Sequence, residues 1–260
     1  KLYSENYKQN FIEIEDFGNQ TVFNLLKKKE INKINLYKKS VNLLNKIQKI
    51  KQNKTKNFIG EVYKIPKYNN DTLFKEAKLF TTWYAKKHIS KKKLSNFNFL
   101  INREIKFLLS NLKSKNDIFV HRDFHVSNLM KYKKQLATID TQDALIGNRA
   151  YDLASLIDDV RFKSNKKFKD NIYNYYLRLN KKKIDKIILL NDFEILSVLR
   201  NMKIIGIFTR LAVRDNKKQY LKLIPYAWKL IELRIKDNKI FNELKKILNF
   251  SFPKKVRNLK

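Results

Sequence analysis

Apolar and polar positions alternate near the start of the chain and follow a helical period over most of the remainder. Residues 11–15, Phe-Ile-Glu-Ile-Glu, alternate apolar and acidic side chains, which is typical of a half-buried strand. The segment Asp16-Phe17-Gly18-Asn19 then predicts a turn, and Thr21 after it is a candidate helix cap. The pattern further predicts a polar loop over 53–70 and helices over 31–51, 71–87 and 97–113.

The pattern changes at residue 118. Ile118-Phe119-Val120 is a short apolar run, and two more such runs, at 129–130 and 136–139, flank a polar turn and predict a hairpin. From Tyr151 onward the helical period continues without a Pro- or Gly-rich linker, so one helical lobe is expected. The predicted helices span 150–163, 167–180, 192–214, 217–236 and 238–249.

The composition is that of a folded, helix-rich protein. Of 260 residues, 43% are hydrophobic and 13% aromatic, enough to bury a core, and 4 Gly and 3 Pro are few for a loop-rich all-β fold. The absence of Cys excludes disulfides, thiolate metal sites and cysteine nucleophiles. No apolar run approaches the roughly 18 residues of a membrane span, and no signal-peptide pattern opens the chain. We expect a cytoplasmic protein with no membrane partner.

The formal net charge of +34 admits two interpretations. One is a polyanionic partner, as for a basic nucleic-acid-associated accessory module without activity. The other is biased composition, because lysines are spread along the whole chain instead of forming one basic stripe. We favour the second and expect no specific nucleic-acid partner.

The apolar run at 118–120 leads into the segment that carries candidate chemistry. After the strand ending at Val120, the chain places Asp123 in a loop, Asn128 five residues later, and Asp140 at the end of the predicted hairpin. Phosphoryl transfer needs a carboxylate to orient and deprotonate the acceptor hydroxyl, and oxygen ligands for Mg²⁺ on the nucleotide. Asp123 suits the first task, and Asn128 and Asp140 supply hard oxygen ligands that Mg²⁺ prefers.

The spacing strengthens this interpretation. His121-Arg122-Asp123 followed by Asn128 is the His-Arg-Asp-x4-Asn pattern of a kinase catalytic loop, and Asp140 follows as a metal-binding Asp would. An isolated Asp-x4-Asn would carry little weight, whereas strand, loop and hairpin together are specific. His125 stays open between a structural loop histidine and a catalytic group.

The next block carries a family resemblance. Residues 139–156 read Ile-Asp-Thr-Gln-Asp-Ala-Leu-Ile-Gly-Asn-Arg-Ala-Tyr-Asp-Leu-Ala-Ser-Leu. This run resembles the aminoglycoside phosphotransferase and choline kinase superfamily, and within it the anomeric sugar kinases that act on N-acetylmuramate and N-acetylglucosamine in cell-wall recycling. Thr141 stands where that pattern has Phe. Residues 14–18, 73–84 and 200–212 resemble the same kinases, so the similarity covers nearly the whole chain.

The resemblance implies an α+β, protein-kinase-like fold. It divides the chain into 1–18, a remnant of the N-terminal lobe's sheet with the hinge, and 19–260, a mostly helical C-terminal lobe with a catalytic hairpin. It implies an ATP- and Mg²⁺-dependent kinase with a small-molecule sugar substrate. An aminoglycoside or choline-type kinase is the alternative, although 24 acidic against 58 basic residues argue against a polycationic substrate.

The resemblance also implies roles for single residues. Asp123 is then the catalytic base, Asn128 and Asp140 are the metal ligands, and backbone groups of Glu15, Asp16 and Phe17 face adenine. His121, Arg122 and Asp152 support the catalytic loop. Candidates for the sugar site are Glu76, Trp83, Asp143 and Arg149. For Trp83 a core aromatic, and for Arg149 a buried structural ion pair, are the rival interpretations.

One part of a kinase is not found in this sequence. A kinase needs a phosphate-covering loop and a Lys from an N-terminal lobe, yet no Gly precedes Gly18 and only about ten residues precede the candidate hinge strand. We therefore expect the sequence to be a fragment that is inactive by itself.

Overall fold

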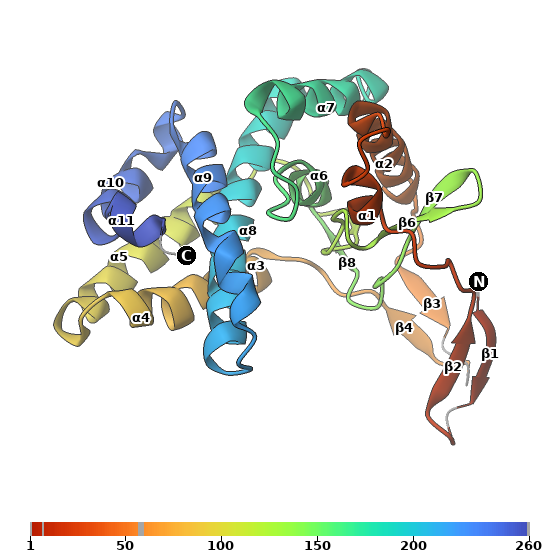
Figure 1. Ribbon diagram of the computed structural model, residues 1–260, viewed down its shortest axis with the longest axis horizontal. Coiled ribbons are helices and arrows are strands. Elements are labelled where there is room, and N and C mark those ends of the chain that lie inside the picture. The colour runs from red at the N-terminus through yellow and green to blue at the C-terminus, as the bar shows by residue number, and fades with distance from the viewer. Residues whose placement is uncertain (1, 7, 57–59, 259–260) are drawn as a thin grey trace.

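The computed structural model describes residues 2–6, 8–56 and 60–258, which form an α+β fold of many helices and four small two-stranded sheets. Figure 1 shows their arrangement. The strands are β1 Leu2–Asn6, β2 Phe11–Ile14, β3 Lys54–Lys56, β4 Val62–Lys64, β5 Ile118–Val120, β6 Leu129–Tyr132, β7 Gln135–Thr138 and β8 Leu145–Gly147. The first helices are α1 Val22–Leu26, α2 Lys33–Ile47, α3 Asn70–Ala77, a π-helix Phe80–Ala85, α4 Lys86–His88 and α5 Lys91–Ser110.

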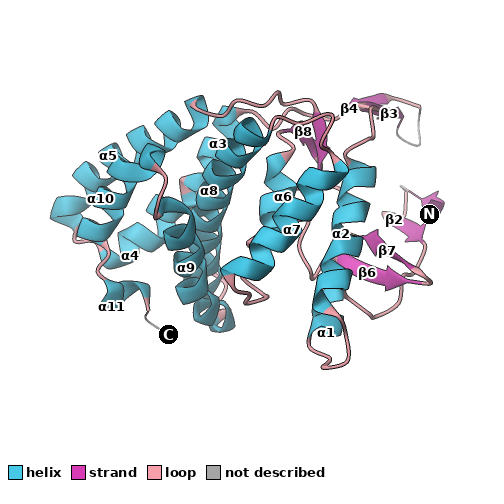
Figure 2. Cartoon of the chain, turned by 90° about the horizontal axis from the view of Figure 1, so that it is seen from above, coloured by secondary structure: helices cyan, strands magenta, loops and turns pink. Residues whose placement is uncertain are grey.

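The later part of the chain is helical and packs around α8. Its helices are α6 Ala150–Ile157, α7 Lys166–Leu179, α8 Lys186–Val213, α9 Ile224–Ile235, α10 Asn242–Ser251 and α11 Lys254–Arg257, with 3₁₀ turns Lys218–Leu223 and Lys239–Phe241. One hydrophobic core runs through the molecule and includes residues as far apart in sequence as Val22 and Phe252. Figure 2 shows most strands gathered at one side of these helices. No helix of the described residues is long and apolar enough to span a bilayer.

The N-terminal strand is present but more exposed than its alternation predicts. β2 pairs antiparallel with β1, a strand that the sequence analysis did not predict. Phe11, Ile12 and Ile14 are 48%, 58% and 60% exposed, so the prediction of a half-buried strand is wrong. A two-stranded sheet has two open faces unless another layer covers one, and all residues of β1 and β2 except the half-buried Asn6 are exposed.

The segment predicted as a polar loop over 53–70 contains a second hairpin. Lys54, Thr55 and Lys56 of β3 pair with Lys64, Tyr63 and Val62 of β4. All six residues are exposed, so pairing is achieved by the backbone without a buried face. Such strands lack the apolar alternation on which the sequence prediction relied.

The hairpin predicted after the catalytic loop is confirmed. β6 pairs antiparallel with β7, from Leu129 opposite Thr138 to Tyr132 opposite Gln135. β5 is also present and pairs with β8, which places the strand before the loop beside the strand before α6. The predicted cap is confirmed as well, because the Thr21 hydroxyl accepts a hydrogen bond from the backbone N–H of Asn24 at 3.0 Å.

Helix boundaries depart from prediction where polar residues or close packing decide them. α8 begins six residues early, because the Asp185 carboxylate accepts from the N–H groups of Ile187 and Ile188. The helix predicted over 71–87 is divided, with a π-helix at Phe80–Ala85. There α8 approaches very closely, since a Cβ on Gly206 would lie 2.3 Å from the carbonyl carbon of Leu79.

Candidate functional site

A buried carboxylate holds the backbone of the loop that carries Asp123. Asp152, fully buried on α6, accepts hydrogen bonds from the backbone N–H groups of His121 at 2.7 Å and Arg122 at 3.0 Å. Burial raises the pKa of Asp152 to about 7, and the two backbone donors oppose that rise. This geometry is what the predicted support role of Asp152 requires.

The side chain of His121 connects this loop to the end of the hairpin. Its Nε2 donates to the carbonyl oxygen of Ile139 at 2.9 Å and lies 2.5 Å from the Thr138 hydroxyl oxygen. Burial lowers the pKa of His121, and the nearby Asp123 and Asp140 carboxylates both act against that shift. Both carboxylates therefore lie near the His121 ring.

Asn128 completes this group at the open end of the β6–β7 hairpin. Its carbonyl oxygen accepts from the N–H of Ile139 at 3.1 Å, next to Asp140. Its side-chain Nδ2 donates to the backbone carbonyl of Asp123 at 3.2 Å. The structure thus brings Asp123, Asn128 and Asp140 together, as the sequence spacing predicts.

The backbone is strained at two positions of this group. Arg122 has φ of 73° and Asp140 has φ of 63°, both in the left-handed region that non-glycine residues rarely adopt. Such outliers persist where the surrounding structure fixes them and cluster at functional sites. The Asp152 hydrogen bond fixes Arg122, and the His121–Ile139 contact fixes the residue before Asp140.

The donor set at the hairpin end fits a hard cation. Because Nδ2 of Asn128 donates to Asp123, the amide oxygen faces the other way and is available as a ligand. Asp140 is exposed. Carboxylate and amide oxygens are ligands that Mg²⁺ accepts, usually with nucleotide phosphates and water completing its shell. Among the described residues there is no group of three or more His, Cys, Asp or Glu that could hold a metal ion.

The Asp123 carboxylate lies among positive charges. Burial raises its pKa, but Lys203 and Arg200 of α8, with Arg122, outweigh that effect and hold the pKa of Asp123 below its usual value. His125 is buried, and burial lowers its pKa to about 3, so the ring is neutral at physiological pH. A buried neutral ring favours the structural interpretation of His125 over a catalytic one.

Glu76 occupies a different position from the one expected for a simple sugar ligand. Its carboxylate accepts from Tyr68 and Arg122 and pairs with Lys203 at 2.8 Å. Burial raises the pKa of Glu76, and these donors, Lys203 first, lower it below the ordinary value. Glu76 therefore links α3 to the catalytic loop and to α8.

Of the other sugar-site candidates, only Asp143 contacts the catalytic loop. Asp143 is exposed, and its backbone carbonyl accepts from Arg122 Nη1 at 3.2 Å. Trp83 is half-buried in the π-helix and makes no polar contact with a described residue. Arg149 lines a separate surface pocket with Gln48 and Lys183. The structure therefore brings only Glu76 and Asp143 to the catalytic loop, both through Arg122.

The rival interpretation of Arg149 is wrong. A buried structural ion pair needs a carboxylate partner, yet Arg149 is half-buried and no carboxylate among the described residues pairs with it. Its backbone carbonyl accepts from Gln48 Nε2 at 2.9 Å, and its side chain lies near the Tyr176 hydroxyl.

The candidate hinge lies against the catalytic hairpin. Glu15 accepts a hydrogen bond from the Tyr132 hydroxyl, and the rings of Phe17 and Tyr132 are 4.9 Å apart. The Asp16 carboxylate accepts from the N–H of Gly18 at 2.7 Å, and Gly18 has φ of 73°, which suits glycine in a turn. The three residues predicted to face adenine thus adjoin the hairpin whose far end carries Asp140.

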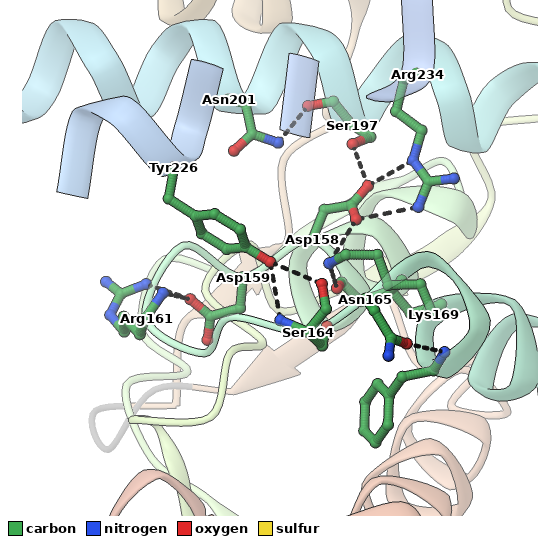
Figure 3. A network of polar contacts seen from close by, with 12 residues as sticks. Asp158, Asp159, Arg161, Ser164, Asn165, Lys169, Ser197, Asn201, Tyr226 and Arg234 are labelled. Carbon is green, nitrogen blue, oxygen red and sulfur yellow. Dashed lines mark hydrogen bonds and ion pairs between the residues drawn. The ribbon is translucent and has the colours of Figure 1, made fainter. Parts of the chain in front are cut away.

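Two acidic residues that the sequence analysis left without a role anchor the site from the helical side (Figure 3). The buried Asp158 pairs with Arg234 at 2.8 Å and Lys169 at 3.1 Å. Burial raises its pKa, and these two cations outweigh burial and lower it strongly. Asp159 accepts from the N–H of Val126 at 3.1 Å and so holds the far end of the catalytic loop. They lie two and three residues after the family-like block 139–156, and this position was the only signal that the sequence offered for them.

Two solved kinase structures share the fold of this chain. The chain superposes on Plasmodium vivax ethanolamine kinase with a TM-score of 0.55 and 16% identity, covering 93% of this chain and 68% of that one. Choline kinase from Cryptosporidium parvum Iowa II gives a TM-score of 0.53 and 13% identity, covering 92% and 72%. At such identities the similarity shows the fold alone, which is protein-kinase-like, as predicted.

Residues 33–185 match the phosphotransferase enzyme family, and the chain belongs to that family. It is 31% identical over 166 residues to an N-acetylmuramate/N-acetylglucosamine kinase of Neisseria meningitidis serogroup B, which is 62% of this chain and 50% of that protein. A kinase of the same name from Pseudomonas aeruginosa is 26% identical over 254 residues, 95% of this chain and 72% of the relative. The match to the Neisseria relative thus spans half of that protein's length.

Proposed function

We propose that this chain is the catalytic part of an ATP- and Mg²⁺-dependent kinase that phosphorylates a hydroxyl group of an amino sugar. The observation that carries this proposal is the meeting of Asp123, Asn128 and Asp140 at one end of the β6–β7 hairpin, around His121. Phosphoryl transfer depends mainly on positioning and charge stabilisation, and this group supplies an acceptor-facing carboxylate next to two oxygen ligands.

In this proposal Asp123 orients the acceptor hydroxyl and takes its proton. No described residue hydrogen-bonds to its carboxylate, whereas Asp152 and Asp159 each accept backbone N–H groups. The positive charges of Lys203 and Arg200 lower the pKa of Asp123, so that it is ionised at neutral pH and can accept a hydrogen bond from a hydroxyl.

Asn128 and Asp140 would hold Mg²⁺. When bound, the ion would neutralise charge on the nucleotide phosphates. Backbone groups of Glu15, Asp16 and Phe17 would receive adenine, because this segment adjoins the hairpin. In this arrangement residues 1–18 are the lobe remnant and hinge, and 19–260 form the phosphotransferase lobe.

The choice of an amino sugar is supported by the names of the relatives from Neisseria meningitidis and Pseudomonas aeruginosa, at modest identity. The charge balance agrees, because 58 basic against 24 acidic residues do not favour a polycationic acceptor. Aminoglycoside and choline-type acceptors are the alternatives that an assay must distinguish.

The test is ADP release with a panel of N-acetylmuramate, N-acetylglucosamine, choline and an aminoglycoside, each with ATP and Mg²⁺. The 260-residue chain and the product of its complete reading frame are assayed in parallel, with Asp123→Asn as the inactive control. In whichever of the two proteins turns over, we expect the acceptor to be an amino sugar. Turnover with choline or the aminoglycoside alone would refute the proposed acceptor and leave the reaction class intact.

A further inference from the structure

Arg200 on α8 is a buried cation beside the candidate catalytic loop. Its exposed fraction is 5%, and it borders a small cavity that Glu76 and Lys203 also line. Its positive charge favours a lower pKa for Asp123 on the loop and for the buried Asp152 and Asp159. The charge of Arg200 thus acts from α8 on the proposed base and on the two carboxylates that hold the loop in place.

Unlike the other buried cations, Arg200 has no direct carboxylate partner. In the part of the chain that the structure describes, the buried lysine and arginine residues besides Arg200 are Lys169, Arg234 and Arg257. Their nearest carboxylate oxygens lie at 3.1, 2.8 and 2.6 Å. Arg200 forms no such ion pair with any described residue, and its Nη1 is buried without a hydrogen-bond partner. Burying a guanidinium without a partner is costly, so a bound anion that pairs with Arg200 would remove part of that cost.

The buried carboxylates near Arg200, Asp152 and Asp159, are bound to other groups and form no ion pair with it. Asp152 is engaged by the backbone of the catalytic loop, and Asp159 is engaged by Val126 N–H and by Arg161 at 3.1 Å. Lys203, one turn along α8, is already paired with Glu76. Arg200 and the Asp123 carboxylate are the two charged groups of this cluster for which no partner is found among the described residues.

From this geometry we propose that Arg200 binds an anionic substituent of the acceptor, and that the chain therefore prefers an amino sugar bearing a carboxylate over its neutral counterpart. The proposal rests on the proposed function, because it places the acceptor beside Asp123. A planar guanidinium matches a carboxylate with two parallel hydrogen bonds, which neutral hydroxyls cannot reproduce. N-acetylmuramate carries such a carboxylate and N-acetylglucosamine does not.

The first experiment measures equilibrium binding by calorimetry, which does not depend on turnover. The probes are N-acetylmuramate, its uncharged methyl ester and N-acetylglucosamine, with the unaltered chain. We expect the acid to bind about 10–100-fold more tightly than the ester, as hydrogen bonds between charged groups allow. Equal affinity of acid and ester would overturn the proposal, because the buried nitrogen would then need no anion and water would suffice.

The second experiment removes the charge. Arg200→Gln should lose that 10–100-fold preference for the acid and bind the ester and N-acetylglucosamine as before. Arg200→Lys should restore part of the preference, since it keeps the charge but not the planar fork. Arg210→Gln is the matched control: it changes an arginine of the same helix about 15 Å further along and should leave all three affinities unchanged.

Two further results distinguish the possible failures. If Arg200→Gln lowers turnover equally with acid and neutral sugars, Arg200 acts on the phosphoryl group or on folding, and the proposal is wrong. If the acceptor panel shows no amino-sugar turnover while acid still binds through Arg200, the proposed function fails and the anion site stands. If Arg200→Gln does not fold, as judged by its melting temperature, the acid–ester comparison on the unaltered chain still decides.

Discussion

The Nε2 of His121 donates a hydrogen bond to the carbonyl oxygen of Ile139 at 2.9 Å, and this contact joins two parts of the candidate site that are separate in sequence. Arg122 and Asp123 follow the histidine, and Asp140 follows the isoleucine. The contact therefore sets the separation between the proposed base and the proposed metal ligand.

Neutralising Asp123 and neutralising Asp140 should have different effects on turnover and on Mg-ATP binding. Asp123→Asn should lower kcat by about 10²–10⁴-fold, as for loss of a general base, with little change in Mg-ATP affinity. Asp140→Asn should weaken Mg-ATP binding itself, because it removes an oxygen ligand of the metal. ADP release and calorimetric titration with Mg-ATP measure the two effects. Unimpaired turnover of Asp123→Asn would show that the base has been misassigned.

The buried Asp152 should make stability depend on pH in an unusual direction. Burial raises its pKa to about 7, against about 3.9 in an unfolded chain. Between these values the folded state holds a proton that the unfolded state has lost, so raising the pH from about 4 to 7 should favour unfolding, by about 1.4 kcal/mol per unit at most.

The comparison that isolates this effect is Asp152→Asn, which cannot titrate. Urea unfolding at pH 4, 5, 6 and 7 should show the unaltered protein losing stability relative to the variant as the pH rises. Parallel curves for the two proteins would mean that the two backbone hydrogen bonds keep Asp152 ionised in spite of its burial.

The ion pair between Asp158 and Arg234 should matter far more than a surface pair. Arg234→Met leaves the buried Asp158 carboxylate with Lys169 as its remaining cation, and should cost about 3–5 kcal/mol. The exposed pair Lys166–Asp170, whose side chains are 67% and 43% exposed, offers the control. Lys166→Met should change the free energy of unfolding by about 0.5 kcal/mol or less. Similar losses in urea denaturation of the two variants would refute this account.

Gly206→Ala should destabilise the protein although alanine is the better helix former. In an exposed helix the change would stabilise by about 1 kcal/mol. Here the new Cβ would lie 2.3 Å from the Leu79 carbonyl carbon and 2.6 Å from the Phe80 nitrogen, so α8 must move away from the π-helix. We expect a loss of about 1–3 kcal/mol in urea unfolding, with Lys186→Ala on the same helix nearly neutral. A stabilised Gly206→Ala protein would show that this contact is not close in solution.

Local signals in the sequence were sufficient for much of the fold. The β6–β7 hairpin, β5 and the cap at Thr21 follow from apolar runs and turn chemistry that act over a few residues. The β3–β4 hairpin escaped prediction because its exposed strands have no apolar face to reveal them. The π-helix was not predicted because it accompanies a close contact with Gly206, which lies more than a hundred residues later in the chain.

The sequence by itself determined the chemical types at the candidate site and their order, because the spacing of Asp123, Asn128 and Asp140 along a strand, loop and hairpin is a local property of the chain. Only the tertiary structure decided which partners those residues have. In the folded chain Glu76 forms ion pairs with Arg122 and Lys203. Arg149 lines a separate pocket, and Arg200 is buried without a carboxylate partner among the described residues. Such pairings join residues many positions apart, and they depend on how helices pack, which no local periodicity specifies.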